Sequence, residues 1–212
     1  MRMVIKINLK IFIFIAVFYF TKQINIYFCL MLFAFIHELG HLLAGVLVGF
    51  KPKSLTIMPL GISINFNIIT INNINIKKLI IALAGPITNL LVILITYVLK
   101  TELYKITYQE IIYSNLLIFL FNLIPLYPLD GGRILKYGLH IKYGIKQSVI
   151  LTNKISNIII IVLTGVSLIA TYYLQNIAII FIQVYLWFIM LLENKKFKLK
   201  KRIFDLTENY LN

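Results

Sequence analysis

Long apolar runs separated by short polar and basic stretches dominate the sequence. Six runs predict helices that cross a membrane: residues 11–20, 24–50, 79–99, 111–124, 149–173 and 177–192. A helical crossing takes about 20 residues, so the first and fourth runs are short. Residues 4–9 can lengthen the first run if Lys6 and Lys10 extend to the interface. The fourth run continues into a proline-containing stretch, which indicates a broken helix.

Residues 53–76 follow a different pattern. Apolar residues alternate there with Ser, Thr and Asn, which predicts short β-strands, and Pro59 with Gly61 predicts a turn between them. Non-helical backbone at membrane depth must be shielded by protein or line a wet cavity. The alternative interpretation is a disordered loop. We expect a short membrane-associated β or re-entrant segment between the second and third helices.

Composition places these runs in a membrane. Hydrophobic residues make up 60% of the chain and charged residues 13%, and the mean hydropathy is +0.91. A soluble domain carries about 25% charged residues. A soluble protein of 212 residues could not bury so much apolar surface, so the composition excludes that class. The single Cys29 excludes a disulfide framework.

Basic residues predict the orientation of the spans. The chain has 21 Lys and Arg against 7 Asp and Glu, a net charge of +14. These cations lie in short clusters between apolar runs rather than along one face, which argues against nucleic acid and for lipid headgroups. With six spans, only Lys22, Lys100 and Lys105 fall on one side. The other 18 predict that both termini are cytoplasmic.

Glu38 is the acidic residue that lies well inside an apolar run. A carboxylate at that depth usually has a partner and a function. His37 and His41 flank it and lie one turn apart on the same helix face. Two imidazoles in this arrangement can reach one Zn²⁺, with the Glu beside them as a base for bound water. A polar cluster satisfied within the core is the alternative.

A catalytic zinc needs a third protein ligand, and two residues are candidates. His140 follows a basic stretch, where a surface histidine is the ordinary interpretation. Asp130 follows Pro125 and Pro128 and precedes two glycines, so a broken helix could turn its carboxylate toward the metal. A helix cap or an interfacial turn is the alternative for Asp130.

Three segments together resemble the site-2 protease (M50) family of intramembrane metallopeptidases. They are residues 37–41 (His-Glu-Leu-Gly-His), 85–89 (Gly-Pro-Ile-Thr-Asn) and 122–131 (Asn-x-x-Pro-x-x-Pro-x-Asp-Gly). They occur in the family's order, and the resemblance covers about residues 24–133. The last segment is most similar to the stage IV sporulation protein FB branch. Many members of that branch carry a C-terminal CBS domain, whereas this sequence ends soon after its sixth run.

The resemblance implies one Zn²⁺ held by His37, His41 and Asp130, with Glu38 as the catalytic base. It also implies that Asn89, Asn122 and Pro128 shape the site or bind substrate. For the two asparagines, hydrogen bonds between helices without a catalytic purpose are the alternative. Gly85 and Pro86 are expected to permit close packing and a kink.

The expected architecture is therefore an all-α polytopic membrane protein. Six transmembrane helices surround a three-helix catalytic core in a membrane-embedded domain of residues 1–192, and residues 193–212 form a basic cytoplasmic tail. The implied activity is that of a zinc metalloendopeptidase in a bacterial cell or forespore membrane. The implied partners are a membrane-associated substrate such as a pro-sigma factor, inhibitory membrane proteins and the lipid bilayer.

Other interpretations remain open on the residues alone. The same protease could act on an anti-sigma factor or on remnant signal peptides. A protein of another class, a non-catalytic membrane scaffold or a metal carrier, could use the same ligands. A carrier would need further acidic or histidine residues along a path through the spans, and the runs hold none beyond this cluster.

Overall fold

The structure is a computed structural model of the 212-residue chain. It describes residues 4–59, 61–67, 74–103 and 106–211. The chain divides into two compact units, Met1–Leu123 and Ile124–Asn212. The histidine motif, residues 37–41, lies in the first unit, and Asp130 lies in the second.

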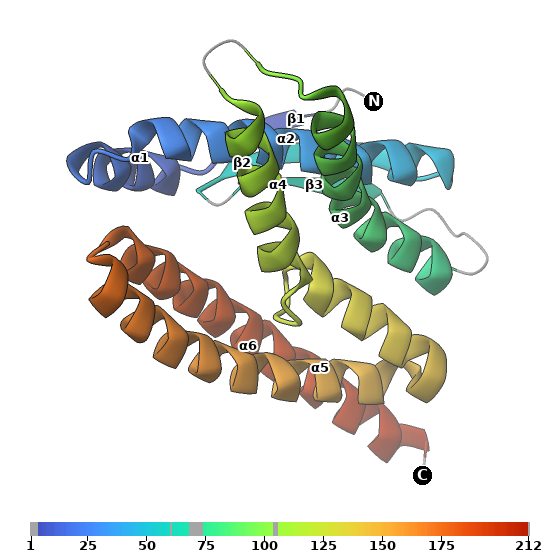
Figure 1. Ribbon diagram of the computed structural model, residues 1–212. Coiled ribbons are helices and arrows are strands. Elements are labelled where there is room, and N and C mark those ends of the chain that lie inside the picture. The colour runs from blue at the N-terminus through green and yellow to red at the C-terminus, as the bar shows by residue number, and fades with distance from the viewer. Residues whose placement is uncertain (1–3, 60, 68–73, 104–105, 212) are drawn as a thin grey trace. The chain divides into compact units, whose positions relative to one another are not determined.

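Three helices form the core of the first unit (Figure 1). The unit contains α1 (Lys10–Phe20), α2 (Ile24–Leu47), α3 (Ile74–Leu99) and α4 (Tyr108–Leu123). Helix α2 packs against both α3 and α4, and α3 packs against α4. Phe33 of α2 joins Ile111 and Ile118 of α4 in a buried apolar cluster. These are the helices expected to form the three-helix core.

A small residue sets the separation of α2 and α3. A Cβ added at Gly40 would overlap the Thr88 hydroxyl and come within 2.9 Å of the Ala84 carbonyl oxygen. Real Cβ atoms do not approach backbone that closely. The glycine inside the histidine motif therefore lets α3 approach the helix face that carries the histidines.

A three-stranded sheet lies beside these helices, in the order β1-β2-β3. The strands are β1 (Val4–Ile7), β2 (Lys51–Met58) and β3 (Gly61–Asn67). The hairpin of β2 and β3 is antiparallel, and Met58 pairs with Gly61 across the turn. The Tyr27 hydroxyl donates a 3.0 Å hydrogen bond to the Pro59 carbonyl and ties the turn to α2. The strands and the turn predicted between the second and third spans are confirmed, although residues 68–73 lie outside the described part.

The prediction that residues 4–9 lengthen the first helix is wrong. Residues Val4–Ile7 form β1, which runs parallel to β2 with Ile5 opposite Leu55. The Asn8 N–H continues the pairing with a 2.9 Å bond to the Ile57 carbonyl. An apolar stretch of this length can form either a strand or a helix. The strand forms here because its backbone can hydrogen-bond to the edge of β2.

The second unit is a helical hairpin of α5 (Asp130–Leu174) and α6 (Ala178–Leu211). Helix α5 is interrupted at Gly144, whose φ is +79°. Asn157 and Asn194 join the two helices through reciprocal amide hydrogen bonds of 3.3 and 2.9 Å. The Thr164 hydroxyl accepts hydrogen bonds from Gln183 and Trp187. Such polar links are a common means of holding helices together in a membrane. Residues 193–211, predicted as a tail, continue α6.

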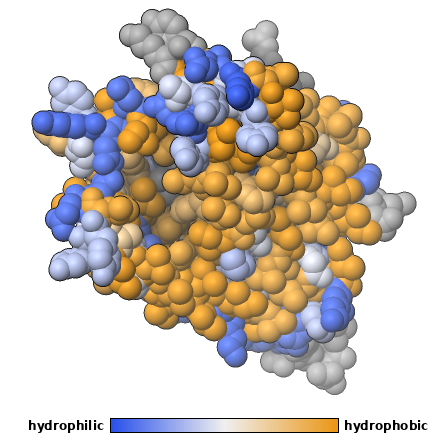
Figure 2. All heavy atoms as spheres, in the orientation of Figure 1, coloured by the Kyte–Doolittle hydropathy of each residue, from blue (hydrophilic) through white to orange (hydrophobic). Residues whose placement is uncertain are grey.

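Among the described residues, α2, α3, α5 and α6 are long and apolar enough to cross a membrane. Helix α1 has 11 residues and α4 has 16, less than the roughly 20 that a crossing needs. Most of the face drawn in Figure 2 is hydrophobic, as lipid contact requires. The fold is thus that of a helical membrane protein with a small sheet, and four of the six predicted spans have membrane length.

Candidate metal centre

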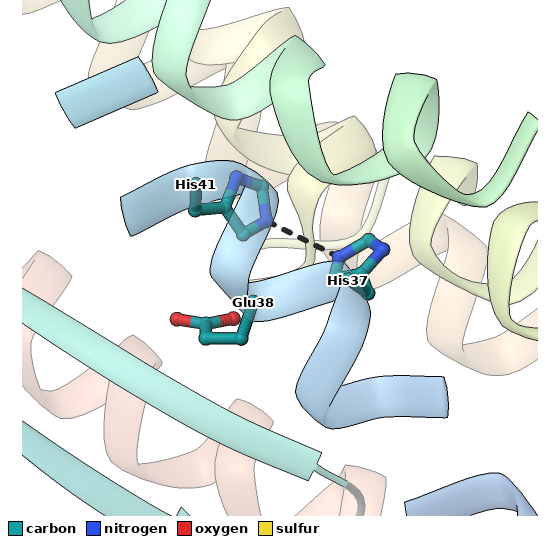
Figure 3. A group of neighbouring side chains, drawn as sticks. All are labelled: His37, Glu38 and His41. Atoms are coloured by element: carbon teal, nitrogen blue, oxygen red, sulfur yellow. Dashed lines mark hydrogen bonds between the residues drawn. The ribbon is translucent and has the colours of Figure 1, made fainter. Parts of the chain in front are cut away.

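Helix α2 brings His37, Glu38 and His41 together, as Figure 3 shows. The Nε2 atoms of the two histidines are 3.2 Å apart, and one potential ligand atom from each of the three residues lies within 4.8 Å of the others. All three are buried, with side chains between 2% and 7% exposed. One turn of helix is therefore enough to aim both imidazoles at a common point.

A chain of hydrogen bonds fixes the tautomer of His37. The Ile111 carbonyl can only accept, so the Asn115 amide nitrogen donates to it at 2.8 Å. The Asn115 oxygen then accepts from the Asn89 amide nitrogen at 2.9 Å. That leaves the Asn89 oxygen to accept from His37 Nδ1. The proton of His37 is thereby held on Nδ1, and Nε2 carries a lone pair.

His41 is oriented in the same way by the backbone of α3. Its Nδ1 lies 2.7 Å from the Ile81 carbonyl oxygen, which can only accept. Nδ1 of His41 is therefore protonated, and its Nε2 also presents a lone pair. Partners of this kind, on the ring nitrogen opposite the metal, hold metal-binding histidines in place in many proteins.

Two Nε2 atoms that face each other at 3.2 Å are close enough to share one cation, either a proton or a metal ion. The surroundings leave room for one, because Gly85 of α3 faces both rings. A Cβ at Gly85 would overlap His41 Nε2 and lie 2.5 Å from His37 Nε2. Neutral imidazoles beside a carboxylate are a donor set that zinc accepts. The residues present fit a zinc ion.

Glu38 points to the other side of the motif, toward the hairpin (Figure 3). Its Oε1 accepts a 2.7 Å hydrogen bond from the backbone N–H of Ile64 in β3. This bond fixes the orientation of the Glu38 side chain. The sheet thus holds a carboxylate next to the two histidines.

Asp130 is the first residue of α5 and is 4% exposed. Its Oδ1 lies 3.7 Å from the Nη1 atom of Arg133, one turn further along the same helix. His140, the other candidate third ligand, also lies on α5 and is half-buried. Both candidates belong to the second unit, and the identity of the third ligand stays a prediction.

The remaining predicted residues have local roles in the structure. Asn122 donates a 3.1 Å hydrogen bond to the Ile118 carbonyl one turn back in α4. Pro128 follows a cis peptide bond in the connection between α4 and α5. Sequence reasoning missed Asn115, Ile64 and the space left by Gly85. Only Asn115 gives a signal, as one of two amides, with Asn122, within an apolar run.

The fold and the site define a class: a helical membrane protein with a buried metal centre of the zinc metallopeptidase type. Two curated proteins are similar to this chain in sequence. The chain is 28% identical over 138 residues to stage IV sporulation protein FB of Bacillus subtilis, covering 63% of this chain and 47% of that protein. It is 28% identical over 160 residues to a zinc metalloprotease of Methanocaldococcus jannaschii, covering 72% and 44%. No protein-family model matches the sequence.

The fold has a solved counterpart, a site-2 protease from Methanocaldococcus jannaschii, with a TM-score of 0.67 and 23% identity over 87% of both chains. The resemblance to site-2 proteases and to stage IV sporulation protein FB is therefore confirmed. The chain spans less than half the length of the two curated relatives.

Proposed function

We propose that the protein is an intramembrane zinc metalloendopeptidase that cleaves a membrane-associated protein. The observation that carries the proposal is the convergence of two Nε2 lone pairs, 3.2 Å apart, beside a buried glutamate. The names of the curated relatives support it. In the proposed site His37, His41 and Asp130 hold the metal.

The chain's own residues perform the proton transfers. Zinc, when bound, polarises a peptide carbonyl and makes a water molecule more acidic. Glu38 accepts the proton from that water as its oxygen attacks the carbonyl carbon. Glu38 then passes the same proton to the leaving amine nitrogen as the C–N bond breaks. The carboxylate returns to its charged form, held by the Ile64 N–H.

Strand β3 supplies a place for the substrate. A helical substrate hides its carbonyls in i→i+4 hydrogen bonds and must unwind before attack. Because β3 is the last strand of the sheet, an extended segment can pair with its outer edge. The N–H of Ile64 points to Glu38 rather than to β2, so a substrate paired at this position would lie against the base.

The basic residues support a topology for the proposed protease, and the resemblance supports a substrate. In the proposed topology both termini lie in the cytoplasm, and water and substrate reach the metal from that side. The similarity to stage IV sporulation protein FB makes a pro-sigma factor the first substrate to test, with a membrane partner protein as the inhibitor. An anti-sigma factor or a remnant signal peptide would use the same site.

Glu38→Gln is the decisive test. The amide keeps the shape of the side chain but cannot take a proton. We expect about one zinc per chain in both proteins by mass spectrometry of the metal, and a loss of cleavage of about 100-fold or more in the variant. Full cleavage by a zinc-loaded Glu38→Gln protein would refute the mechanism. Zinc transport across vesicles without cleavage would favour a carrier.

A further inference from the structure

A pocket with a strongly basic lining lies between α5 and α6 in the second unit. It is partly open to solvent, and its lining comes from both helices and from Tyr127, which precedes α5. Three lysines line it, Lys136, Lys196 and Lys200, against one acidic residue, Glu193. Glu193 is already paired with Lys196 at 2.5 Å. The pocket therefore carries a net positive charge after its internal ion pair is counted.

A buried hydroxyl in the same pocket lacks a partner. Thr152 lines the pocket and is 3% exposed. Within the described residues, its Oγ1 is the buried side-chain polar atom without a hydrogen bond. Leaving such a group unsatisfied is costly, so native structures usually give it a protein or ligand partner. An anion in the pocket would accept a hydrogen bond from it.

The position of the pocket along the hairpin matches the surface of a bilayer. Thr152 precedes Leu174, the last residue of α5, by 22 positions (174 − 152). That is about 33 Å of helix, and the hydrocarbon core is about 30 Å thick. Residues 155–174 and 178–192 contain no Asp, Glu, Lys or Arg. With the α5–α6 turn at one surface, the pocket lies at headgroup level at the other.

Its walls suit an amphipathic ligand. Val149, Met190 and Phe197 provide apolar surface. Tyr127 closes another side, and Lys136 Nζ lies 4.5 Å from the centre of its ring. Basic pockets between transmembrane helices at this depth are a known way to bind the phosphate of anionic lipids.

We propose that this pocket binds a phosphate group, with Lys136, Lys200 and the Thr152 hydroxyl as its partners. The phosphate belongs either to an anionic phospholipid or to a soluble phosphate ester. The residues that line the pocket all belong to the second unit, whereas the histidines belong to the first, and the proposal does not depend on protease activity.

The test measures ligand binding to the purified full chain in a neutral detergent. The probes are dioctanoyl phosphatidylglycerol, dioctanoylglycerol, which lacks the phosphate, and glycerol phosphate, which lacks the acyl chains. Binding of phosphatidylglycerol alone assigns a lipid headgroup, and equal binding of glycerol phosphate assigns a soluble ester. Dioctanoylglycerol bound as tightly as phosphatidylglycerol would overturn the proposal.

Matched variants separate the pocket from general positive charge. Lys136→Gln and Lys200→Gln should each weaken binding about fivefold, whereas Lys142→Gln and Lys201→Gln, on the same helices but outside the pocket, should not. Thr152→Val keeps the side-chain shape and should weaken binding about tenfold. Without ligand it should melt no lower than the wild type, because it removes an unsatisfied group. Equal effects of pocket and control variants would also overturn the proposal.

Discussion

The backbone N–H of Ile64 donates a 2.7 Å hydrogen bond to Oε1 of Glu38. This bond joins β3 of the hairpin to Glu38, which lies between His37 and His41 in the sequence. Phe66, two residues further along β3, lies against Gly45 of α2, where no Cβ could be added without meeting its ring. The position of β3 and the orientation of the Glu38 carboxylate are therefore coupled. If Glu38 acts as proposed, a change in the hairpin should alter turnover without removing the metal.

Ile64→Pro tests this coupling. Proline removes the N–H, and because that N–H points away from β2, the hairpin keeps its ladder. We expect kcat to fall about tenfold or more, with zinc content unchanged. Ile62→Pro is the matched control, since N–H groups two residues apart face the same edge. It should raise KM by weakening substrate pairing while changing kcat less. An unchanged kcat in Ile64→Pro would contradict the coupling.

Asn115→Leu tests the hydrogen-bond chain that holds His37. Asn115 is 0% exposed and orients Asn89, which accepts from His37 Nδ1. Loss of such an outer partner typically weakens metal affinity about 10–100-fold. Competition with a zinc chelator measures the change. Asn157→Leu, which breaks a pair between α5 and α6, is the control and should leave zinc affinity as it is. Equal affinities in the wild type and Asn115→Leu would exclude this role.

The part of the site that could be predicted from sequence is the local part. His37, Glu38 and His41 lie within one turn, so helical geometry alone places their side chains together. Asn115 reaches His37 only through Asn89 and the packing of three helices, and its sequence signal is no more than an amide in an apolar run that also contains Asn122. Ile64 contributes a backbone N–H, which any residue but proline has. Contacts of that kind leave no mark in the sequence.

In the fold, too, local features could be predicted from the sequence and long-range ones could not. The alternation in residues 53–67 predicts the hairpin because period-two patterns are local. Residues Val4–Ile7 are predicted as part of a helix because their pairing partners in β2 lie 50 positions away (54 − 4). The lengths of the membrane helices can be predicted from the apolar runs. The extension of α6 through a basic segment cannot, because Lys and Arg end a membrane span and yet are good helix formers.

Asp130→Ala and His140→Ala distinguish the two predicted third ligands. If Asp130 binds zinc, its loss should lower zinc affinity by more than the roughly 100-fold that an outer partner contributes. His140→Ala should then retain about one zinc per chain. The two residues lie on the same helix, so circular dichroism of both variants checks that the helix persists. The reverse result, with zinc lost only in His140→Ala, would reassign the ligand.

Gly85→Ala provides the most direct test of the metal site, because it adds a single carbon. That carbon would overlap His41 Nε2 and lie 2.5 Å from His37 Nε2, where the metal must bind. We expect zinc stoichiometry to fall close to zero and cleavage to be lost. Gly165→Ala in α5 is the matched control, since nothing lies within 4 Å of its added Cβ. Alanine favours a helix over glycine by about 1 kcal/mol, so this control should fold normally and keep its zinc. Gly85→Ala with full zinc content would mean that the histidines bind metal from another direction, and that the space beside α3 is not the metal site.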